Sequence, residues 1–184
     1  MHGGDDLRRG AAEPAGDQST EGTMVERAER KAAMRVMVAF DDSECSRYAL
    51  SWALRYLLSP DDSRLIIFCA QPLLEFSYVF ATSTYIVTPV DLISDLQENQ
   101  RKATLALLEQ AKEICTPHGI SAETLTEVGE PKDAICEVVK KHHIQLLIMG
   151  SHGRGAIQRA FLGSVSNYCV HNANCPVLIV RKPA

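Results

Sequence analysis

Five short apolar runs recur along the chain, and each has the length of a β-strand rather than of a helix. They cover residues 35–40, 65–70, 120–128, 146–149 and 176–180. The first, second and fourth runs are almost continuously apolar, which is typical of strands covered on both faces in a parallel sheet. The third run alternates weakly between apolar and polar residues and is predicted to lie at a sheet edge.

Apolar residues at helical spacing fill the stretches between these runs and predict four helices. The first helix follows Asp41-Asp42-Ser43 and stops at residues 59–62, and the second runs from Pro89 to about Cys115. The third begins at Glu130-Pro131, with its proline in the first turn. The fourth begins at Ser164, which we predict as the N-cap residue, with Gly163 as the turn before it.

The alternation of five strands with four helices predicts an α/β protein with a doubly wound parallel sheet. The first strand runs into Asp41 and the fourth into Gly150, and these are the most unusual strand ends chemically. We therefore predict that these two strands are neighbours that flank the point where strand order reverses. Ligands bind beyond the carboxyl ends of the strands at such a point.

Composition narrows the class of protein. Residues 1–33 contain almost no large apolar side chains and are expected to form a disordered tail before one domain at 34–184. A net charge of −4 disfavours a nucleic-acid groove as the main site. No apolar run approaches the roughly 20 residues of a membrane span, and the start lacks the apolar centre of a signal peptide. We expect a cytoplasmic protein, with the nucleus as a second location.

The six cysteines lack the spacing of a metal or disulfide framework. None forms a C-x-x-C pair, and the chain is long for a fold held by disulfides. Cys169-x-His171-x-x-x-Cys175 is a grouping that hints at a metal, but no second pair completes a tetrahedral set. The sequence therefore predicts no metal site.

Residues 144–165 carry the most specific chemical signal. An apolar run ends at Gly150 and Gly153, and Gly163-Ser164 then stands at a predicted helix start. Glycines let backbone N–H groups approach a phosphate without a Cβ in the way. A helix start adds unpaired N–H groups and a partial positive charge. Arg154 and Arg159 add two cations, so the stretch predicts an anion site. The alternative is that the glycines only make turns.

This pattern, Gly150-x-x-Gly153-(nine)-Gly163-Ser164, resembles the nucleotide loop in the ATP-binding branch of the universal stress protein family. The opening Arg-Val-Met-Val-Ala-Phe-Asp-Asp-Ser-Glu and the closing Cys-Pro-Val-Leu-Ile-Val-Arg also resemble the family, particularly its plant members. The similarity runs from about Met34 to Lys182. It implies a Rossmann-like fold of the adenine nucleotide alpha-hydrolase type, with strand order 3-2-1-4-5. It also implies a site for ATP, AMP or ADP, with Mg²⁺ held by the phosphates.

The resemblance assigns roles to individual residues. Asp41 would accept hydrogen bonds from the ribose or adenine, although it could instead serve to cap a helix. Ala39 would line the sugar, the backbone of Ala70 would contact adenine, and Met149 and Gly150 would flank the ribose. The phosphates would lie against Gly153, Gly163, Ser164 and Val165. Arg154 and His152 would touch phosphate or remain in solvent.

The same residues bear on catalysis. Hydrolysis requires a positioned base or water-orienting group and usually carboxylates for a metal. The chain has no Walker Lys-Ser/Thr pair and no Gly-x-Ser-x-Gly elbow. We therefore expect a regulatory nucleotide-binding protein in a stress response, with slow ATP hydrolysis at most. A phospho-acceptor receiver domain lacks support, because no later strand ends in an acceptor Asp. The alternative is a chaperone-like or interaction module that binds no nucleotide.

The last strand predicts self-association. Its first residue is Pro176 and its last is Val180, and an apolar edge strand tends to aggregate unless it is paired. The family resemblance implies a homodimer in which two copies of this strand pair across a two-fold axis. The aromatic stretch at 71–88 is interpreted as a lid, a dimer patch or packing on the sheet rim. Other protein partners cannot be inferred from these patterns.

Overall fold

The computed structural model describes residues 33–61, 63–72, 90–153 and 162–183, with no side-chain detail for 90–93. The elements are β1 (Met34–Ala39), α2 (Glu44–Tyr56), β2 (Ser63–Gln71), α4 (Val90–Cys115), a 3₁₀ turn η1 (Thr116–His118), β3 (Ala122–Val128), α5 (Pro131–Lys141), β4 (Leu146–Gly150), α6 (Ser164–Asn172) and β5 (Val177–Val180). Residues 1–32 of the predicted tail at 1–33 lie outside the described residues, as do residues 73–88 of the aromatic stretch at 71–88.

The strands form one parallel sheet in the order β3-β2-β1-β4-β5. Val36 of β1 lies opposite Leu65 of β2 on one side and Leu146 of β4 on the other. The predicted order 3-2-1-4-5 is therefore confirmed, and so is the position of β3 at an edge. β1 and β4 are neighbours, as the chemistry of their ends predicted.

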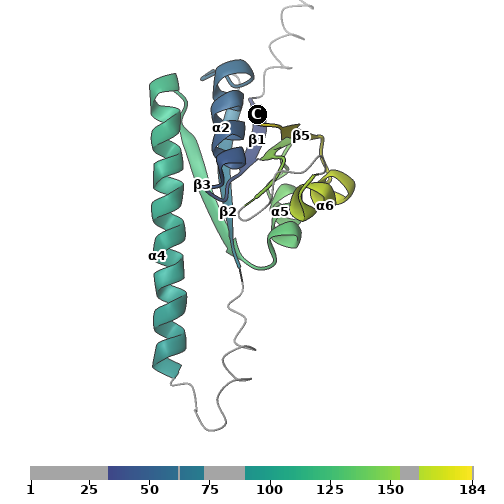
Figure 1. Cartoon of the computed structure of the whole chain (residues 1–184). Helices are drawn as coiled ribbons and strands as arrows, with labels where there is room; N and C mark the ends of the chain where they lie inside the picture. Colours follow the sequence, from purple (N-terminus) through teal and green to yellow (C-terminus); the bar gives the residue numbers. More distant parts are fainter. Residues whose placement is uncertain (1–32, 62, 73–89, 154–161, 184) are drawn as a thin grey trace, which may run out of the picture. The chain divides into compact units, whose positions relative to one another are not determined.

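Two apolar cores cover the two faces of the sheet. Val36 and Val38 point to the face where α2 and α4 pack, with Leu50 and Leu108 in the same core. Met37 points to the opposite face and packs with Val138 of α5 and other residues of α5 and α6. Figure 1 shows α2 and α4 on one side of the strands and α5 and α6 on the other. Burial on both faces explains why the central strands are continuously apolar.

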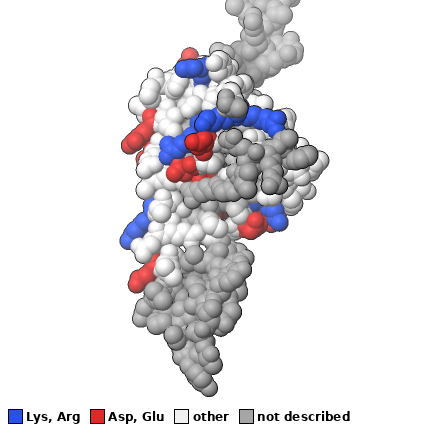
Figure 2. Space-filling model, in the orientation of Figure 1, with Lys and Arg blue, Asp and Glu red and all other residues white. Residues whose placement is uncertain are grey.

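Charged side chains of both signs are mixed on the surface. On the face shown in Figure 2, acidic and basic side chains stand next to each other rather than in separate fields. Two such ion pairs lie at the first turn of α2, Arg47 with Asp42 and Lys182 with Glu44.

All six cysteines are free thiols. Within the described ranges, no helix has the length and apolarity to cross a bilayer, and no three side chains are grouped to hold a metal ion.

Candidate functional site

A cavity of about 340 Å³ opens beyond the carboxyl ends of β1, β2 and β4. It lies where the sequence places a ligand site, because the connections from β1 and β4 leave towards opposite faces of the sheet. Every predicted site residue that the structure describes lines this cavity: Ala39, Asp41, Ala70, Met149, Gly150, Gly153, Gly163, Ser164 and Val165. His152 lines it too, whereas Arg154 and Arg159 lie outside the described residues.

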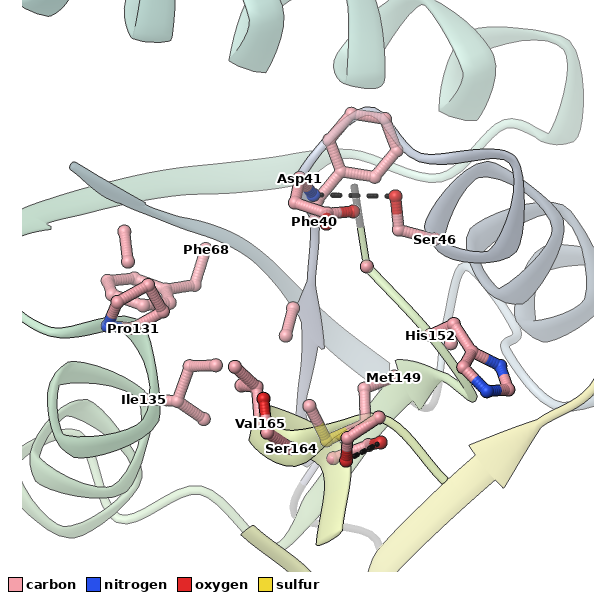
Figure 3. A pocket seen from close by; sticks show the side chains of 16 residues that line it. Phe40, Asp41, Ser46, Phe68, Pro131, Ile135, Met149, His152, Ser164 and Val165 are labelled. Carbon is pink, nitrogen blue, oxygen red and sulfur yellow. Dashed lines mark hydrogen bonds between the residues drawn. The ribbon is translucent and has the colours of Figure 1, made fainter. Parts of the chain in front are cut away.

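The sequence interpretation missed much of the cavity wall. Phe40, Ser46, Phe68, Pro131, Ile135 and Ser166 also line it. Figure 3 shows Phe68, Pro131 and Ile135 together on one side of the space, with Met149 across from them. The sequence could have indicated Pro131 and Ile135, because α5 starts directly after β3. Its first turn must therefore lie at the edge of the sheet where the strands end. Nothing in the sequence indicates Phe40 and Phe68, since strand residues give no sign of what they face beyond the strand end.

Asp41 is oriented by the turn that joins β1 to α2. Its Oδ1 accepts hydrogen bonds from the Ser43 backbone N–H at 3.1 Å and the Ser43 hydroxyl at 2.6 Å. Asp42, the next residue, has φ of 64°, a left-handed conformation that Asp tolerates better than most residues. Figure 3 shows the Asp41 backbone N–H directed at the Ser46 hydroxyl, 3.4 Å away. The carboxylate is therefore fixed at the cavity rim.

Ser43 is the residue that caps α2. Its hydroxyl oxygen accepts a hydrogen bond from the Ser46 backbone N–H at 3.1 Å. Asp41 supports this cap rather than providing it, because its Oδ1 holds the Ser43 hydroxyl. The alternative that Asp41 itself caps the helix is therefore wrong, and its contact with a ligand stays a prediction. Oδ1 belongs to the turn, while Oδ2 lies on the Gly153 side, where an added Cβ would come within 2.7 Å of it.

Packing requires glycine at position 150 of the motif but not at position 163. A Cβ on Gly150 would lie 2.7 Å from the carbonyl carbon of Cys45, so glycine lets β4 end against the first turn of α2. The sequence pattern assigned Gly150 to the ligand and gave no sign of this helix contact. A Cβ on Gly163 would meet its nearest atoms, in Ser151 and His152, at 3.4 Å. Gly163 is therefore not required by packing.

The start of α6 corrects one prediction. Gly163, not Ser164, is the N-cap residue, and Ser164 is the first helical residue. The Gly163 N–H donates to the Ser151 carbonyl at 2.8 Å, which holds Gly163 extended, and the Gly163 carbonyl accepts from the Asn167 N–H at 2.9 Å. The preference of serine for N-cap positions is thus overridden by a tertiary hydrogen bond.

This arrangement leaves the first turn of α6 without a side-chain cap. Gly163 has no side chain, and no capping hydrogen bond is present at this helix start in the described chain. The Ser166 hydroxyl is directed backwards, 3.0 Å from the Ser151 carbonyl and 2.9 Å from the Gly163 carbonyl. The first backbone N–H groups of a helix have no partner within the helix. Those of Ser164 and Val165 lie at the cavity, where the helix dipole favours negative charge.

The end of β2 offers a second set of backbone groups. Phe40, the residue after β1, donates its N–H to the Phe68 carbonyl at 2.8 Å, and the register of β1 with β2 ends at Ala39 and Phe68. Along a strand, the N–H and C=O of alternate residues point to the same side. Those of Ala70 therefore point to the side of β1, beyond the point where β1 has ended. One donor and one acceptor face the cavity at this position.

The comparisons with known proteins agree with this geometry. A sequence model of the universal stress protein family matches residues 32–181. The chain belongs to the universal stress protein family. Its relatives include the universal stress protein A-like protein of Arabidopsis thaliana, which is 30% identical over 161 residues, or 82% of this chain and 91% of the relative. The resemblance drawn from the glycine motif is confirmed.

Solved universal stress proteins share the fold. One, from Arabidopsis thaliana with AMP bound, superposes with a TM-score of 0.59 at 27% identity and covers 82% of this chain and 93% of its own. Another, in complex with cAMP, has a TM-score of 0.53 at 25% identity and covers 80% of this chain and 95% of its own. Both proteins were therefore solved with an adenine nucleotide.

Proposed function

We propose that this universal stress protein binds an adenine nucleotide, ATP in particular, as a regulatory protein in a stress response. The observation that carries the proposal is the first turn of α6, which no described side chain caps and which faces the cavity lined by Asp41, Gly153 and Gly163. A helix start that no described side chain caps is suited to a phosphate. AMP and cAMP in the two solved relatives support the choice of an adenine nucleotide.

The phosphates would lie at the start of α6. The N–H groups of Ser164 and Val165 and the Ser164 hydroxyl would donate to phosphate oxygens. Gly153 and Gly163 line the same cavity, and glycine lets backbone N–H groups approach a phosphate without a Cβ in the way. Arg154, in the loop between the two glycines, would add a positive charge. Mg²⁺ would accompany the nucleotide and be held by its phosphates. Small-molecule cavities typically span about 300–1,000 Å³, and a cavity of about 340 Å³ falls in that range.

The ribose would lie over the ends of β1 and β4. Ala39 and Met149 offer apolar surface there, and Gly150 also lines the cavity. Asp41 would accept hydrogen bonds from the ribose hydroxyls through Oδ2, since its Oδ1 is already held by Ser43. This geometry favours a sugar with free hydroxyls at the rim.

The base would lie between the end of β2 and the start of α5. Phe68 and Ile135 provide apolar walls for a flat ring. The N–H and C=O of Ala70 form a donor and acceptor pair, which complements the adenine edge that carries N1 and the exocyclic amino group. Guanine presents the opposite pattern, an N–H and a carbonyl, at the same edge. The pairing therefore favours adenine.

Binding rather than turnover is the proposed activity, with hydrolysis slow at most. Among the described cavity residues, Asp41 is the one carboxylate. It stands at the proposed sugar end and is engaged by Ser43. In-line attack on a terminal phosphate requires a group that orients water beside that phosphate. The described residues at the start of α6 supply donors for binding and no such carboxylate.

Titration calorimetry of the purified full chain with ATP, AMP and GTP tests the proposal. We expect ATP to bind with a Kd near one micromolar, about −8 kcal/mol, and GTP to bind far more weakly. Gly153→Val should abolish binding, because its Cβ would displace the Asp41 carboxylate and its methyl groups would fill the phosphate end. Gly129→Ala is the control, since its Cβ meets Ala134 at an ordinary 3.7 Å. Wild-type protein that ignores millimolar ATP, with and without magnesium, would leave the chaperone-like or interaction module as the better reading.

We also propose a homodimer through the last strand, from Pro176 to Val180. β5 pairs with β4 on one side and forms the opposite edge of the sheet. Its residues Val177, Leu178 and Ile179 are half-buried rather than fully covered. Leu178→Lys should give monomers in sedimentation velocity, with circular dichroism as the check that the variant is folded. A wild-type chain that sediments as a monomer contradicts this proposal.

A further inference from the structure

A second cavity, of about 480 Å³, lies beside the carboxyl end of β2, on the face of the sheet that α4 covers. Its walls are mostly methyl and methylene groups with a few amides: Cys69, Ala70, Pro72, Gln100, Ala103, Thr104, Ala106, Leu107, Gln110 and Pro131, with Asp41 and Asp42 at one end. Gln100 donates its side-chain N–H to the Pro72 carbonyl at 2.8 Å, which ties α4 to the end of β2. Neither the sequence motif nor the proposed nucleotide contacts use this space.

The two cavities adjoin. Asp41, Ala70 and Pro131 line both of them. The register of β1 with β2 ends at Phe68, so no strand of the described chain covers the β1 side of Ala70. In Figure 3, Asp41 and Pro131 come from different elements and stand apart at the rim of the first cavity. The space beside Ala70 therefore continues from the nucleotide cavity towards α4.

The expected orientation of the nucleotide directs one part of it to this junction. With the phosphates at the start of α6 and the base at Ala70, the edge of the base farthest from the sugar faces Ala70. In adenine that edge carries N1 and the exocyclic nitrogen, N6. A single substituent on N6 leaves one N–H, which still donates to a carbonyl. The substituent itself would extend past Ala70, between Asp41 and Pro131, into the second cavity.

We propose, on the basis of the nucleotide function above, that the second cavity accepts an apolar substituent on N6, so that the protein binds N6-substituted adenine nucleotides as well as ATP. The lining selects an alkyl or benzyl group, because Ala103, Ala106 and Leu107 present hydrocarbon. At the acidic end, Asp42 is paired with Arg47 and Asp41 is held by Ser43. An uncharged substituent thus matches the cavity better than a charged one.

The test is titration calorimetry of the full chain with ATP and with N6-benzyl-ATP. Wild type should bind N6-benzyl-ATP as tightly as ATP or tighter. Ala103→Trp should fill the second cavity and weaken N6-benzyl-ATP by at least about tenfold while leaving ATP unchanged. Ala103 is an exposed helix position, so the variant leaves the core intact. Leu105→Trp is the matched control, because Leu105 is an exposed residue of α4 that lines neither cavity.

The outcomes separate this inference from the function on which it rests. If wild type binds ATP but binds N6-benzyl-ATP at least about tenfold more weakly, the base pocket is closed and the inference is wrong while the nucleotide function stands. The inference is also wrong if Ala103→Trp and Leu105→Trp affect N6-benzyl-ATP equally. If neither compound binds, the proposed function fails and this inference fails with it.

Discussion

The starts of α2 and α6 have similar surroundings but different N-cap residues. Each helix follows a central strand, β1 or β4, and each begins beside the same cavity. At α2, the Ser43 side chain caps the helix and is itself held by Asp41. At α6, the N-cap is Gly163, which has no side chain to offer.

The difference shows how one fold divides its backbone donors between stability and binding. An N-cap side chain typically stabilises a helix by about 1 kcal/mol. The chain uses this contribution at α2, where the cap also fixes Asp41. At α6, no described side chain supplies this contribution, and the first backbone N–H groups of the helix face the cavity, where an anion could accept from them. The predictions below alter one start at a time.

The largest effect should come from Gly150→Ala, which forces the end of β4 away from the first turn of α2. The added Cβ would lie 2.7 Å from the backbone of Cys45, and backbone cannot move aside as a flexible side chain can. We expect the free energy of unfolding to fall by about 1–3 kcal/mol in urea titrations. Gly129→Ala, which introduces no close contact, should be nearly neutral. Equal stabilities for the two variants would contradict the packing role of Gly150.

Gly163→Asp should make the start of α6 resemble that of α2. Gly163 has φ of −64° and ψ of 159°, which any residue can adopt, and aspartate is a favoured N-cap. The new carboxylate would occupy the first-turn donors and repel phosphate, so ATP affinity should fall at least about tenfold, or 1.4 kcal/mol. Stability without ligand should rise by a few tenths of a kcal/mol.

Gly163→Ala separates the cap from the loss of glycine, because alanine has no capping oxygen. It should retain much more ATP affinity than Gly163→Asp in the same calorimetric titration. If the aspartate variant binds ATP as well as wild type does, the donors of α6 are not where the phosphates lie.

Ser43→Ala should weaken the self-capped start. The variant loses the α2 cap, in which the hydroxyl accepts from the Ser46 N–H, and the contacts of the hydroxyl with Asp41 Oδ1 and the His152 carbonyl. We expect a loss of about 1 kcal/mol of unfolding free energy, together with weaker ATP binding as Asp41 becomes less fixed. Ser51→Ala is the matched control, since Ser51 is exposed on the same helix and its hydroxyl bonds only the Arg47 carbonyl of the preceding turn among the described contacts. A stability loss without any change in affinity would show that Asp41 does not contact the ligand.

The smallest effect concerns the buried thiol of Cys169 in α6, and it appears only in alkali. Cys169 of α6 is fully buried, and burial raises the pKa of its thiol to about 12. The folded protein therefore keeps a proton that the unfolded chain releases near the ordinary pKa of 9.0. The stability from this thiol is fully present below pH 9 and is lost as pH rises towards 12.

At a pH equal to the unfolded pKa, this loss should be about 0.4 kcal/mol. Unfolding titrations at neutral pH and above pH 9 should show the stability advantage of wild type over Cys169→Ala shrinking in alkali. An advantage over Cys169→Ala that is constant with pH would contradict a raised pKa in the folded state.

The sequence predicted the parts of the fold that local pattern determines. Continuously apolar runs identified the central strands, and the unusual residues Asp41 and Gly150 placed β1 beside β4. Pro131 in the first turn of α5 was also predicted, because within a helix proline is well tolerated only in the first turn. The full strand order came from the family resemblance, because the apolar runs alone do not show which strands are neighbours in the sheet.

The rest depends on contacts between segments distant in the sequence. The N-cap of α6 was misplaced by one residue because the Ser151 carbonyl, twelve positions earlier than Gly163, decides where that helix begins. The contact of Gly150 with Cys45 likewise joins β4 to α2 and leaves no trace in either segment alone. Arg154 lies outside the described residues, so its predicted phosphate contact stays a prediction.

The Ser151 carbonyl has a practical consequence. By accepting hydrogen bonds from the Gly163 N–H and the Ser166 hydroxyl, it clasps the two ends of the intervening loop independently of what lies between them. Lengthening a loop whose ends are already joined adds little entropy penalty, because that penalty grows only logarithmically with length. An insertion between residues 153 and 162 would therefore start and finish close to Ser151, and a fluorescent module placed there would report on occupancy of the neighbouring helix start.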